Sequence, residues 1–219
     1  MSQQIVLNLT NESDLIKKAY KYVIYNNESN FLPYHNLSHL INVAGWSYEI
    51  LKSVDVTDIH KQYLMVVAGL FHDFNHSGGK EKDDHINIQY ALAGFDNFIK
   101  DSNFAVPEFS DEDYKFIQTI IKYTKFPHES ILEEDKEFEL YIGIIRDADL
   151  LQMTCDSYVP HVVLGLSKEL NISIEDMIKS QSKFIDSIKW NTPIVAELFN
   201  KFWYNLLKQN SEHLEKLYV

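Results

Sequence analysis

The chain has 219 residues, and its 45% hydrophobic content is enough to build the core of one large domain. Its formal net charge of −12 at pH 7 would repel a polyanion, so we expect no polymeric nucleic acid among its partners. A small anion that binds through bound cations is compatible with this charge. Cys155 is the single cysteine, which excludes an intrachain disulfide and a thiolate-rich metal cluster. Nitrogen and oxygen atoms must therefore hold any metal.

The sequence shows neither a membrane-spanning segment nor a linker between domains. No apolar run reaches the roughly 18 residues that a membrane-spanning helix needs. The N-terminal stretch MSQQIVLNLTNESDLIKK lacks the basic-then-apolar order of a signal peptide. We therefore expect a cytoplasmic protein with no membrane partner. With few glycines and prolines and no internal repeat, the sequence predicts one domain over residues 1–219.

Helical periodicity dominates the chain. The first example, SDLIKKAYKYVIY at 13–25, begins with a capping residue and places Leu15, Ala19 and Val23 at helical spacing. Strand-like alternation is nearly absent, so the sequence predicts an all-α fold. Pro160 falls inside one expected helix, which predicts either a kink or a helix that begins there. The predicted helices lie near 13–25, 37–53, 57–75, 84–100, 111–124, 136–152, 155–170, 174–188 and 192–209.

The stretch PYHNLSH, residues 33–39, places two histidines in different local environments. Pro33 stops any preceding helix, and Asn36 is a good N-cap residue. His39 then lies in the first turn of the next helix and can point inward. His35 precedes the cap on a non-helical residue, so it need not bind the same ion. This pattern predicts one metal ligand and one free acid.

The apolar stretch LMVVAGLFHDFNH, residues 64–76, ends in His72, Asp73 and His76. Burial of an imidazole and a carboxylate costs several kcal/mol unless a partner compensates, and a divalent cation is one such partner. On a continuous helix His72 and His76 share a face, whereas Asp73 lies about 100° away from His72. A hydrogen-bonded His–Asp pair without metal explains this segment equally well by itself.

A third apolar stretch, YIGIIRDADLLQ at 141–152, is interrupted by Asp147 and Asp149. Aspartates in such a run need a partner. Arg146 could neutralise Asp147, which makes Asp149 the better ligand candidate and Asp147 the alternative. Two imidazoles and two carboxylates suit Zn, Mn, Fe or Mg. The complete candidate set is His39, His72, Asp73 and Asp149.

The order of these residues resembles the HD-domain superfamily of metal-dependent phosphohydrolases, which implies an all-α bundle with a metal site at its centre. More narrowly, five motifs resemble, in the same order, the catalytic domain of class I cyclic-nucleotide phosphodiesterases. The similarity extends over most of the chain from about residue 33 to about residue 190, and the first two motifs are strong together. The motifs are YHNLSH, HDFNHSG, YTKFPH, ADL and SQSKFIDSI.

The resemblance implies roles for the residues that match these motifs. His39, His72, Asp73 and Asp149 become the ligands of one divalent cation, and Asp73 also bridges to a second cation and so belongs to the catalytic machinery. His35 becomes the general acid that protonates the leaving alkoxide.

The resemblance also implies a substrate-binding set. It places His76 near the phosphate, Gln181 in a hydrogen bond to a purine base, and Phe184 against that base. Gln181 and Phe184 are also three residues apart on an expected helix, which is the spacing of an ordinary pair of surface and core residues.

Some positions depart from the family pattern. Gln89 stands where a glutamate is expected, which removes the obvious partner of His35. Lys125 and Asn75 each replace an aspartate, and the chain is shorter than those catalytic domains. None of these changes affects the metal ligands, but they leave the substrate open.

We expect a metal-dependent phosphohydrolase that cleaves a phosphodiester in a small nucleotide, with a cyclic nucleotide as the first candidate. Metal-bound hydroxide would attack phosphorus, and a proton from His35 would be worth about 10²–10⁴ in rate. The alternatives are a nucleotide phosphomonoesterase, a diiron oxygenase and a non-catalytic nucleotide-binding module. The oxygenase requires further histidine ligands, for which His85 and His128 are the candidates.

Overall fold

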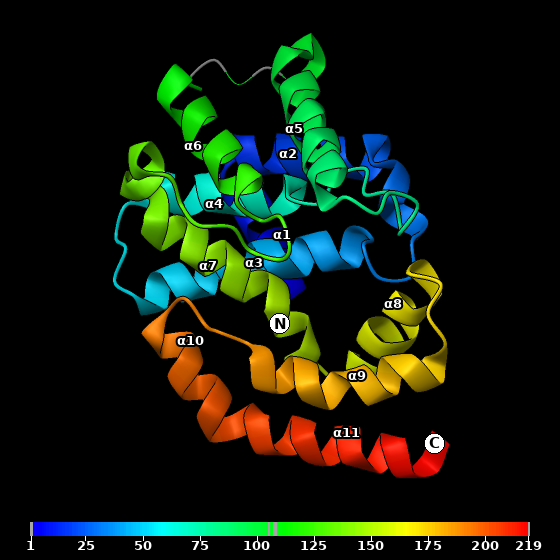
Figure 1. Cartoon of the computed structure of the whole chain (residues 1–219). Coiled ribbons are helices and arrows are strands. Elements are labelled where there is room, and N and C mark those ends of the chain that lie inside the picture. The colour runs from blue at the N-terminus through cyan, green and yellow to red at the C-terminus, as the bar shows by residue number, and fades with distance from the viewer. Residues whose placement is uncertain (1, 105, 107–108, 219) are drawn as a thin grey trace.

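The computed structural model describes residues 2–104, 106 and 109–218, and these residues contain helices but no β-strand (Figure 1). The predicted all-α class is therefore confirmed. None of the helices in these ranges is both long and apolar enough to cross a bilayer. The α-helices are α1 (Ser2–Glu12), α2 (Asp14–Asn26), α3 (Leu37–Ser53), α4 (Ile59–Phe71), α5 (Asp84–Lys100), α6 (Asp111–Lys122), α7 (Glu139–Leu150), α8 (Leu164–Glu169), α9 (Ile174–Ser187), α10 (Pro193–Leu198) and α11 (Tyr204–Tyr218).

Several helices begin at the side-chain caps that the sequence contains. The Asn36 side chain accepts hydrogen bonds from the backbone N–H groups of Ser38 and His39, at 2.9 and 3.2 Å. Ser13 caps α2 in the same way. The predicted cap at Asn36 is thus confirmed, and it places His39 in the first turn of α3.

Helix α1 was not among the helices predicted from the sequence. Only its Val6 and Leu9 are buried hydrophobic residues. The helix packs on α3 where Gly45 has no side chain, since a Cβ there would lie 2.5 Å from the carbonyl oxygen of Ser2. Tertiary packing rather than intrinsic propensity therefore stabilises α1.

The larger hydrophobic core surrounds α3 and α4, which lie in the middle of the molecule, with α5 and α6 at one end and α11 at the other (Figure 1). Gly69 in α4 lets these two helices approach closely, because a Cβ on it would lie 2.6 Å from the Cα of Ala44. This close contact brings the first turn of α3 near the end of α4. It therefore controls the position of the candidate ligands on both helices.

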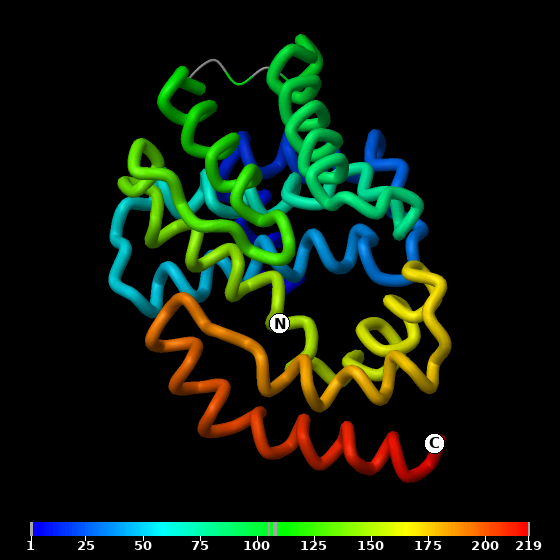
Figure 2. Tube along the Cα trace, viewed as in Figure 1, coloured from blue at the N-terminus to red at the C-terminus, as the bar shows by residue number. Residues whose placement is uncertain are grey.

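A second, smaller core cluster lies between α9 and α11, which run side by side in Figure 2. Met177, Ile185 and Leu207 are among its buried residues. The partly buried Trp190 packs against both clusters, so the two cores meet at this side chain. A single domain over residues 1–219 stays a prediction.

Three of the expected helices have different bounds in the structure. Helix α4 ends at Phe71 rather than near residue 75, and residues 72–75 form turns. The helix expected at 155–170 begins as a π-helical segment, Tyr158–Val163, which contains Pro160 near its start, where a missing N–H costs least. The helix expected at 192–209 runs through α10, a π-helical segment (Phe199–Trp203) and α11.

We predict that Gly69→Ala lowers the free energy of unfolding by about 1–3 kcal/mol, because the added methyl group meets the backbone of α3. Urea denaturation monitored by circular dichroism measures the change. Gly143→Ala in α7 is the matched control, since its nearest neighbour is a side-chain atom of Asn191 at 3.0 Å. Equal stabilities for the Gly69 variant and the wild type would contradict this account of the α3–α4 contact.

Candidate metal centre

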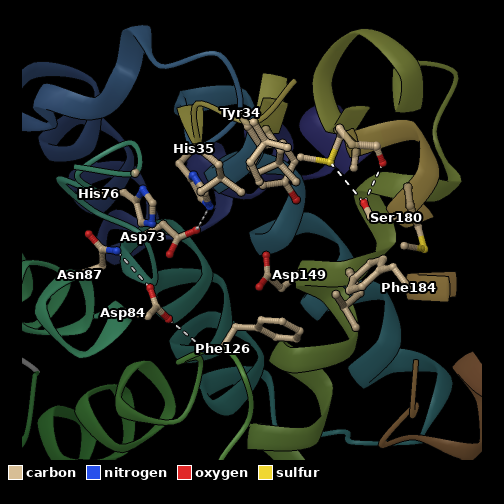
Figure 3. A pocket seen from close by; sticks show the side chains of 18 of the residues that line it. Tyr34, His35, Asp73, His76, Asp84, Asn87, Phe126, Asp149, Ser180 and Phe184 are labelled. Atoms are coloured by element: carbon tan, nitrogen blue, oxygen red, sulfur yellow. Dashed lines mark hydrogen bonds and ion pairs between the residues drawn. The ribbon is translucent and has the colours of Figure 1, made fainter. Parts of the chain in front are cut away.

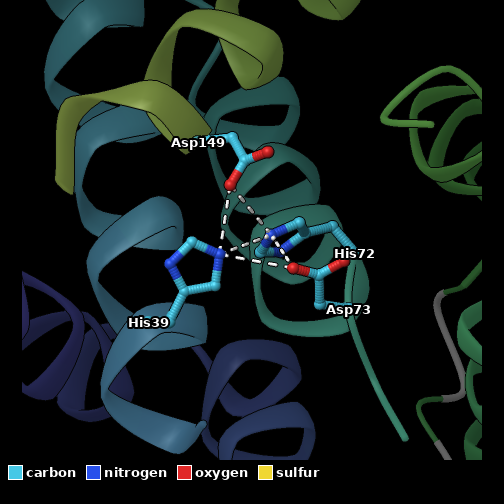
Figure 4. Close-up of side chains that lie close together, drawn as sticks. All are labelled: His39, His72, Asp73 and Asp149. Carbon is cyan, nitrogen blue, oxygen red and sulfur yellow. Dashed lines mark hydrogen bonds and ion pairs between the residues drawn. The ribbon is translucent and has the colours of Figure 1, made fainter. Parts of the chain in front are cut away.

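The structure brings the four predicted ligands together (Figure 4). His39 comes from the first turn of α3, His72 and Asp73 from the turn that follows α4, and Asp149 from the last turn of α7. One ligand atom of each residue lies within 4.8 Å of the others. These four side chains could therefore hold a metal ion, and we call them the metal group.

The distances between these atoms match those around one cation. The Nε2 atom of His39 lies 3.3 Å from Asp73 Oδ2 and 3.1 Å from Asp149 Oδ1. The Nε2 atom of His72 lies 3.1 Å and 3.6 Å from the same two oxygens. Bonds of about 2.0–2.2 Å to one ion place neighbouring ligand atoms roughly 2.9–3.6 Å apart. The arrangement therefore fits one shared cation.

The two imidazoles present the correct nitrogen to such an ion. His72 donates its Nδ1–H to the backbone carbonyl of Gly69 at 2.8 Å, which leaves the lone pair of Nε2 toward the carboxylates. The Nε2 atoms of His72 and His39 are 3.3 Å apart. The Nδ1 atom of His39 is buried and has no hydrogen-bond partner among the described residues. A donor set of two nitrogens and two oxygens suits zinc, manganese or iron.

The charges of this cluster depend strongly on one another. Burial by itself would lower the pKa of His72. The effects of Asp73 and Asp149 together outweigh burial and hold this pKa well above its usual value. The pKa of His39 is raised for the same reasons. Burial would raise the pKa of Asp149, whereas its hydrogen bonds with the two histidines bring that pKa below its usual range. The two carboxylates therefore favour positive charge at this place, which a divalent cation would supply.

Asp147 and Asp149 lie in different surroundings. The prediction that Arg146 neutralises Asp147 is wrong. Arg146 does not pair with Asp147 but donates to the carbonyl oxygens of Tyr123 and Glu129, each at 2.8 Å. Successive residues of a helix are about 100° apart, so neighbouring side chains face different elements.

The fully buried Asp147 instead ties α7 to the segment that precedes α10. It accepts hydrogen bonds from the backbone and side chain of Asn191, both at 2.8 Å. It also accepts from the backbone and hydroxyl of Thr192, at 2.7 and 2.6 Å. Asp147 is thus a structural residue, and the metal group contains Asp149.

His35 has a partner that the sequence analysis missed. Its Nδ1 lies 2.6 Å from a carboxylate oxygen of Glu169, whose side chain is 1% exposed. Glu169 also accepts hydrogen bonds from the backbone N–H groups of Tyr34 and His35. Burial raises the pKa of Glu169, but its contacts with His35 bring it below the usual value. Gln89, the position considered for this role, is exposed on α5.

His76 does not share a helix face with His72, because α4 ends before both residues. Asn75, the residue before His76, has a positive φ of 58°. The ring of His76 stacks on that of His35, with ring centroids 3.6 Å apart. Its Nδ1 accepts a hydrogen bond from Gly78 N–H at 3.1 Å. Burial and the neighbouring His35 lower the pKa of His76 to about 4. His76 is therefore a neutral imidazole with its proton on Nε2.

A pocket of about 490 Å³ adjoins the metal group, and Figure 3 shows His35, Asp73 and Asp149 on its wall. Gln181 and Phe184, both predicted to bind substrate, also line it. Phe126 faces Phe184 with ring centroids 6.3 Å apart, although it was not predicted as a site residue. The structure therefore places all the predicted site residues at one pocket or at the metal group beside it.

Two further observations limit where metal ligands can lie. His35, His76 and Glu169 form a second group of close donor atoms, but its imidazoles are stacked and the Nδ1 of His35 is engaged by the carboxylate. Neither His85 nor His128 belongs to a metal-type group within the described ranges. His85 is exposed at the start of α5.

Comparisons with protein-family models, with curated proteins and with solved structures found no match.

We predict opposite effects for two aspartates of α7. Asp147→Ala should lower the free energy of unfolding by about 3–5 kcal/mol, because it strands buried donors of Asn191 and Thr192, while metal binding remains. Asp149→Ala should abolish tight binding of a divalent metal and cost the metal-free protein less stability. Urea denaturation with chelator and elemental analysis after dialysis measure the two effects. Tight metal binding by the Asp149 variant would contradict the assignment.

Proposed function

We propose that the protein is a metal-dependent phosphohydrolase of the HD-domain type that cleaves a phosphodiester in a small nucleotide. The observation that carries this proposal is the position of the His35–Glu169 pair beside the metal group. The Nε2 atom of His35 lies 4.0 Å from Asp73 Oδ2, on the wall of the same pocket. A candidate proton donor and a candidate cation site thus face one cavity.

The residues His39, His72, Asp73 and Asp149 would hold the cation. Such a cation would supply Lewis acidity, an activated water and neutralisation of phosphate charge. The fit of the donor atoms supports this assignment, and the protein's own part is to position them. The hydrogen bond from His72 to the carbonyl of Gly69 and the close α3–α4 contact serve that purpose.

His35 is suited to give a proton to the leaving oxygen. Its Nδ1 is bound by the Glu169 carboxylate, which fixes the ring and leaves Nε2 on the side of Asp73 and the pocket. An alkoxide is a poor leaving group, and protonation by a positioned imidazole contributes about 10²–10⁴ in rate. The neutral His76, with its proton on Nε2, can donate a hydrogen bond to a phosphate oxygen.

The charges around the pocket favour a diester over a monoester. Of the described residues that line it, Lys82 is the single lysine or arginine, whereas Asp73, Glu81, Asp84 and Asp149 are acidic. A phosphodiester carries one negative charge, and a monoester near neutral pH carries close to two. The diester therefore needs less cationic compensation. A cyclic nucleotide remains the first candidate substrate because of the family resemblance.

We predict that His35→Gln keeps its metal but loses about 10²–10⁴ in kcat on a phosphodiester with an alkoxide leaving group. Turnover of bis(p-nitrophenyl) phosphate, whose leaving phenolate needs no proton, should fall less than about 10-fold. Steady-state kinetics with Mn²⁺, Mg²⁺ or Zn²⁺ and elemental analysis measure both effects. Equal losses on the two substrates would remove His35 from the role of general acid.

Glu169→Gln tests the partner of His35, because an amide has one acceptor oxygen where the carboxylate has two. It cannot accept hydrogen bonds from His35 Nδ1 and from the backbone N–H groups of Tyr34 and His35 at the same time. We expect kcat on the diester with an alkoxide leaving group to fall by about 10–100-fold, because the imidazole loses its fixed orientation, and turnover of bis(p-nitrophenyl) phosphate to fall less. Equal kcat values for the variant and the wild type on the alkoxide diester would show that Glu169 does not position His35.

A further inference from the structure

The pocket beside the metal group has two chemically different ends. At the metal end lie His35, Asp73 and Asp149. Away from it, the wall is formed mainly by hydrophobic side chains from the end of α7, the segments that follow it, α9 and the loop after α6. The residues that define this apolar end are Leu150, Met153, Val162, Met177, Phe126 and Phe184. Figure 3 shows Phe126 and Phe184 on the side of Asp149 away from His35 and His76.

The amide of Gln181, on the wall formed by α9, is already engaged by the protein. Gln181 accepts a hydrogen bond from the Tyr158 hydroxyl at 2.8 Å through its Oε1. Its Nε2 donates to the carbonyl oxygen and the sulfur of Met177, at 3.2 and 3.3 Å. Gln181 is 4% exposed, so little of its amide can reach a ligand. The donors of this side chain are thus used within the wall.

Two hydroxyl groups on the same wall are also satisfied internally. Ser180 donates to the carbonyl of Met177 at 2.7 Å, and Thr124 donates to the carbonyl of Ile121 at 2.8 Å. Tyr34 lies at the metal end, where its ring packs on His39 with centroids 4.7 Å apart. A ring in the apolar end would therefore meet hydrophobic and aromatic groups rather than a free hydrogen-bonding pattern.

This arrangement determines how strongly the site can discriminate. A pocket built to hydrogen-bond a substrate group rejects an analogue without it by about 10⁴–10⁵, whereas an apolar pocket separates similar ligands by roughly 10–200-fold. Stacking on an aromatic side chain tolerates every base, because every base has a π-face. Phe126 and Phe184 provide such faces from the loop before Pro127 and from α9.

We propose that the site accepts phosphodiesters whose attached group is any nucleobase or a simple aromatic ring, and that it does not read the identity of the base. This inference rests on the proposed function. Gln181 then acts as a positioning residue that ties α9 to the π-helical segment through Tyr158, rather than as the residue that hydrogen-bonds a purine. In this proposal Gln181 makes no hydrogen bond to a purine base, in contrast to the role that the family resemblance implies. Phe184 packs against the base, as the resemblance implies.

The test compares kcat/KM for the 3′,5′-cyclic phosphates of adenosine, guanosine, cytidine and uridine, with bis(p-nitrophenyl) phosphate as the non-nucleotide diester. All four cyclic nucleotides should be turned over with constants within about 200-fold of one another, the range of an apolar pocket. Calorimetry with the four nucleoside 5′-monophosphates provides a second readout, and their dissociation constants should also agree within about 200-fold. A preference for one base above about 200-fold in either measurement would overturn the inference.

Two variants separate contact with a ring from recognition of a base. Gln181→Met keeps an unbranched side chain of similar length and removes the amide, so the ratios among the four nucleotides should stay the same. Phe184→Leu should weaken all four together, by about 3–30-fold, because one π-face is lost. Thermal unfolding of both variants shows whether the wall remains folded. Loss of one nucleotide alone in the Gln181 variant would contradict the inference.

Failure of this inference differs from failure of the proposed function. Turnover of bis(p-nitrophenyl) phosphate with a strong preference for one base overturns the inference alone. No turnover of any diester with Mn²⁺, Mg²⁺ or Zn²⁺ overturns both.

Discussion

Two carboxylates and two imidazoles lie close together beside the larger hydrophobic core, and their charges must compensate each other. Asp73 and Asp149 both lie within 3.3 Å of His39 Nε2. Two carboxylates this close repel each other unless positive charge lies between them. The carboxylates raise the pKa of both histidines, and a divalent cation held by the four side chains would supply positive charge directly. The close approach of α3 and α4 at Gly69 serves to hold the donor atoms in place.

Residues that are close in the sequence have different contacts in this site because of the local backbone geometry. His35 and His39 flank the cap at Asn36, so the first pairs with Glu169 and the second faces the metal group. Asp147 and Asp149 lie on different sides of α7, so one binds the chain before α10 and the other joins the ligands. The contacts of each side chain are thus determined by its position relative to a helix cap or around a helix axis, and not by its residue type.

The sequence was sufficient to predict the parts of the site that depend on local structure. Apolar periodicity and the Asn36 cap predict the helices that carry His39 and Asp149. The partner of His35 could not be found in this way, because Glu169 is 134 residues away and a glutamate in an amphipathic segment looks like a solvated residue. The end of α4 at Phe71 and the docking of α1 on Gly45 are likewise set by tertiary contacts.

X-ray absorption spectroscopy of the protein loaded with one equivalent of Zn²⁺ or Mn²⁺ measures the proposed ligand set itself. We expect a coordination shell of nitrogen and oxygen atoms at about 2.0–2.2 Å, with the multiple-scattering signature of two imidazoles. Asp149→Ala should change this shell, and Asp147→Ala should not. A shell without imidazole scattering, or one that neither substitution alters, would contradict the assignment of the metal group and the function proposed from it.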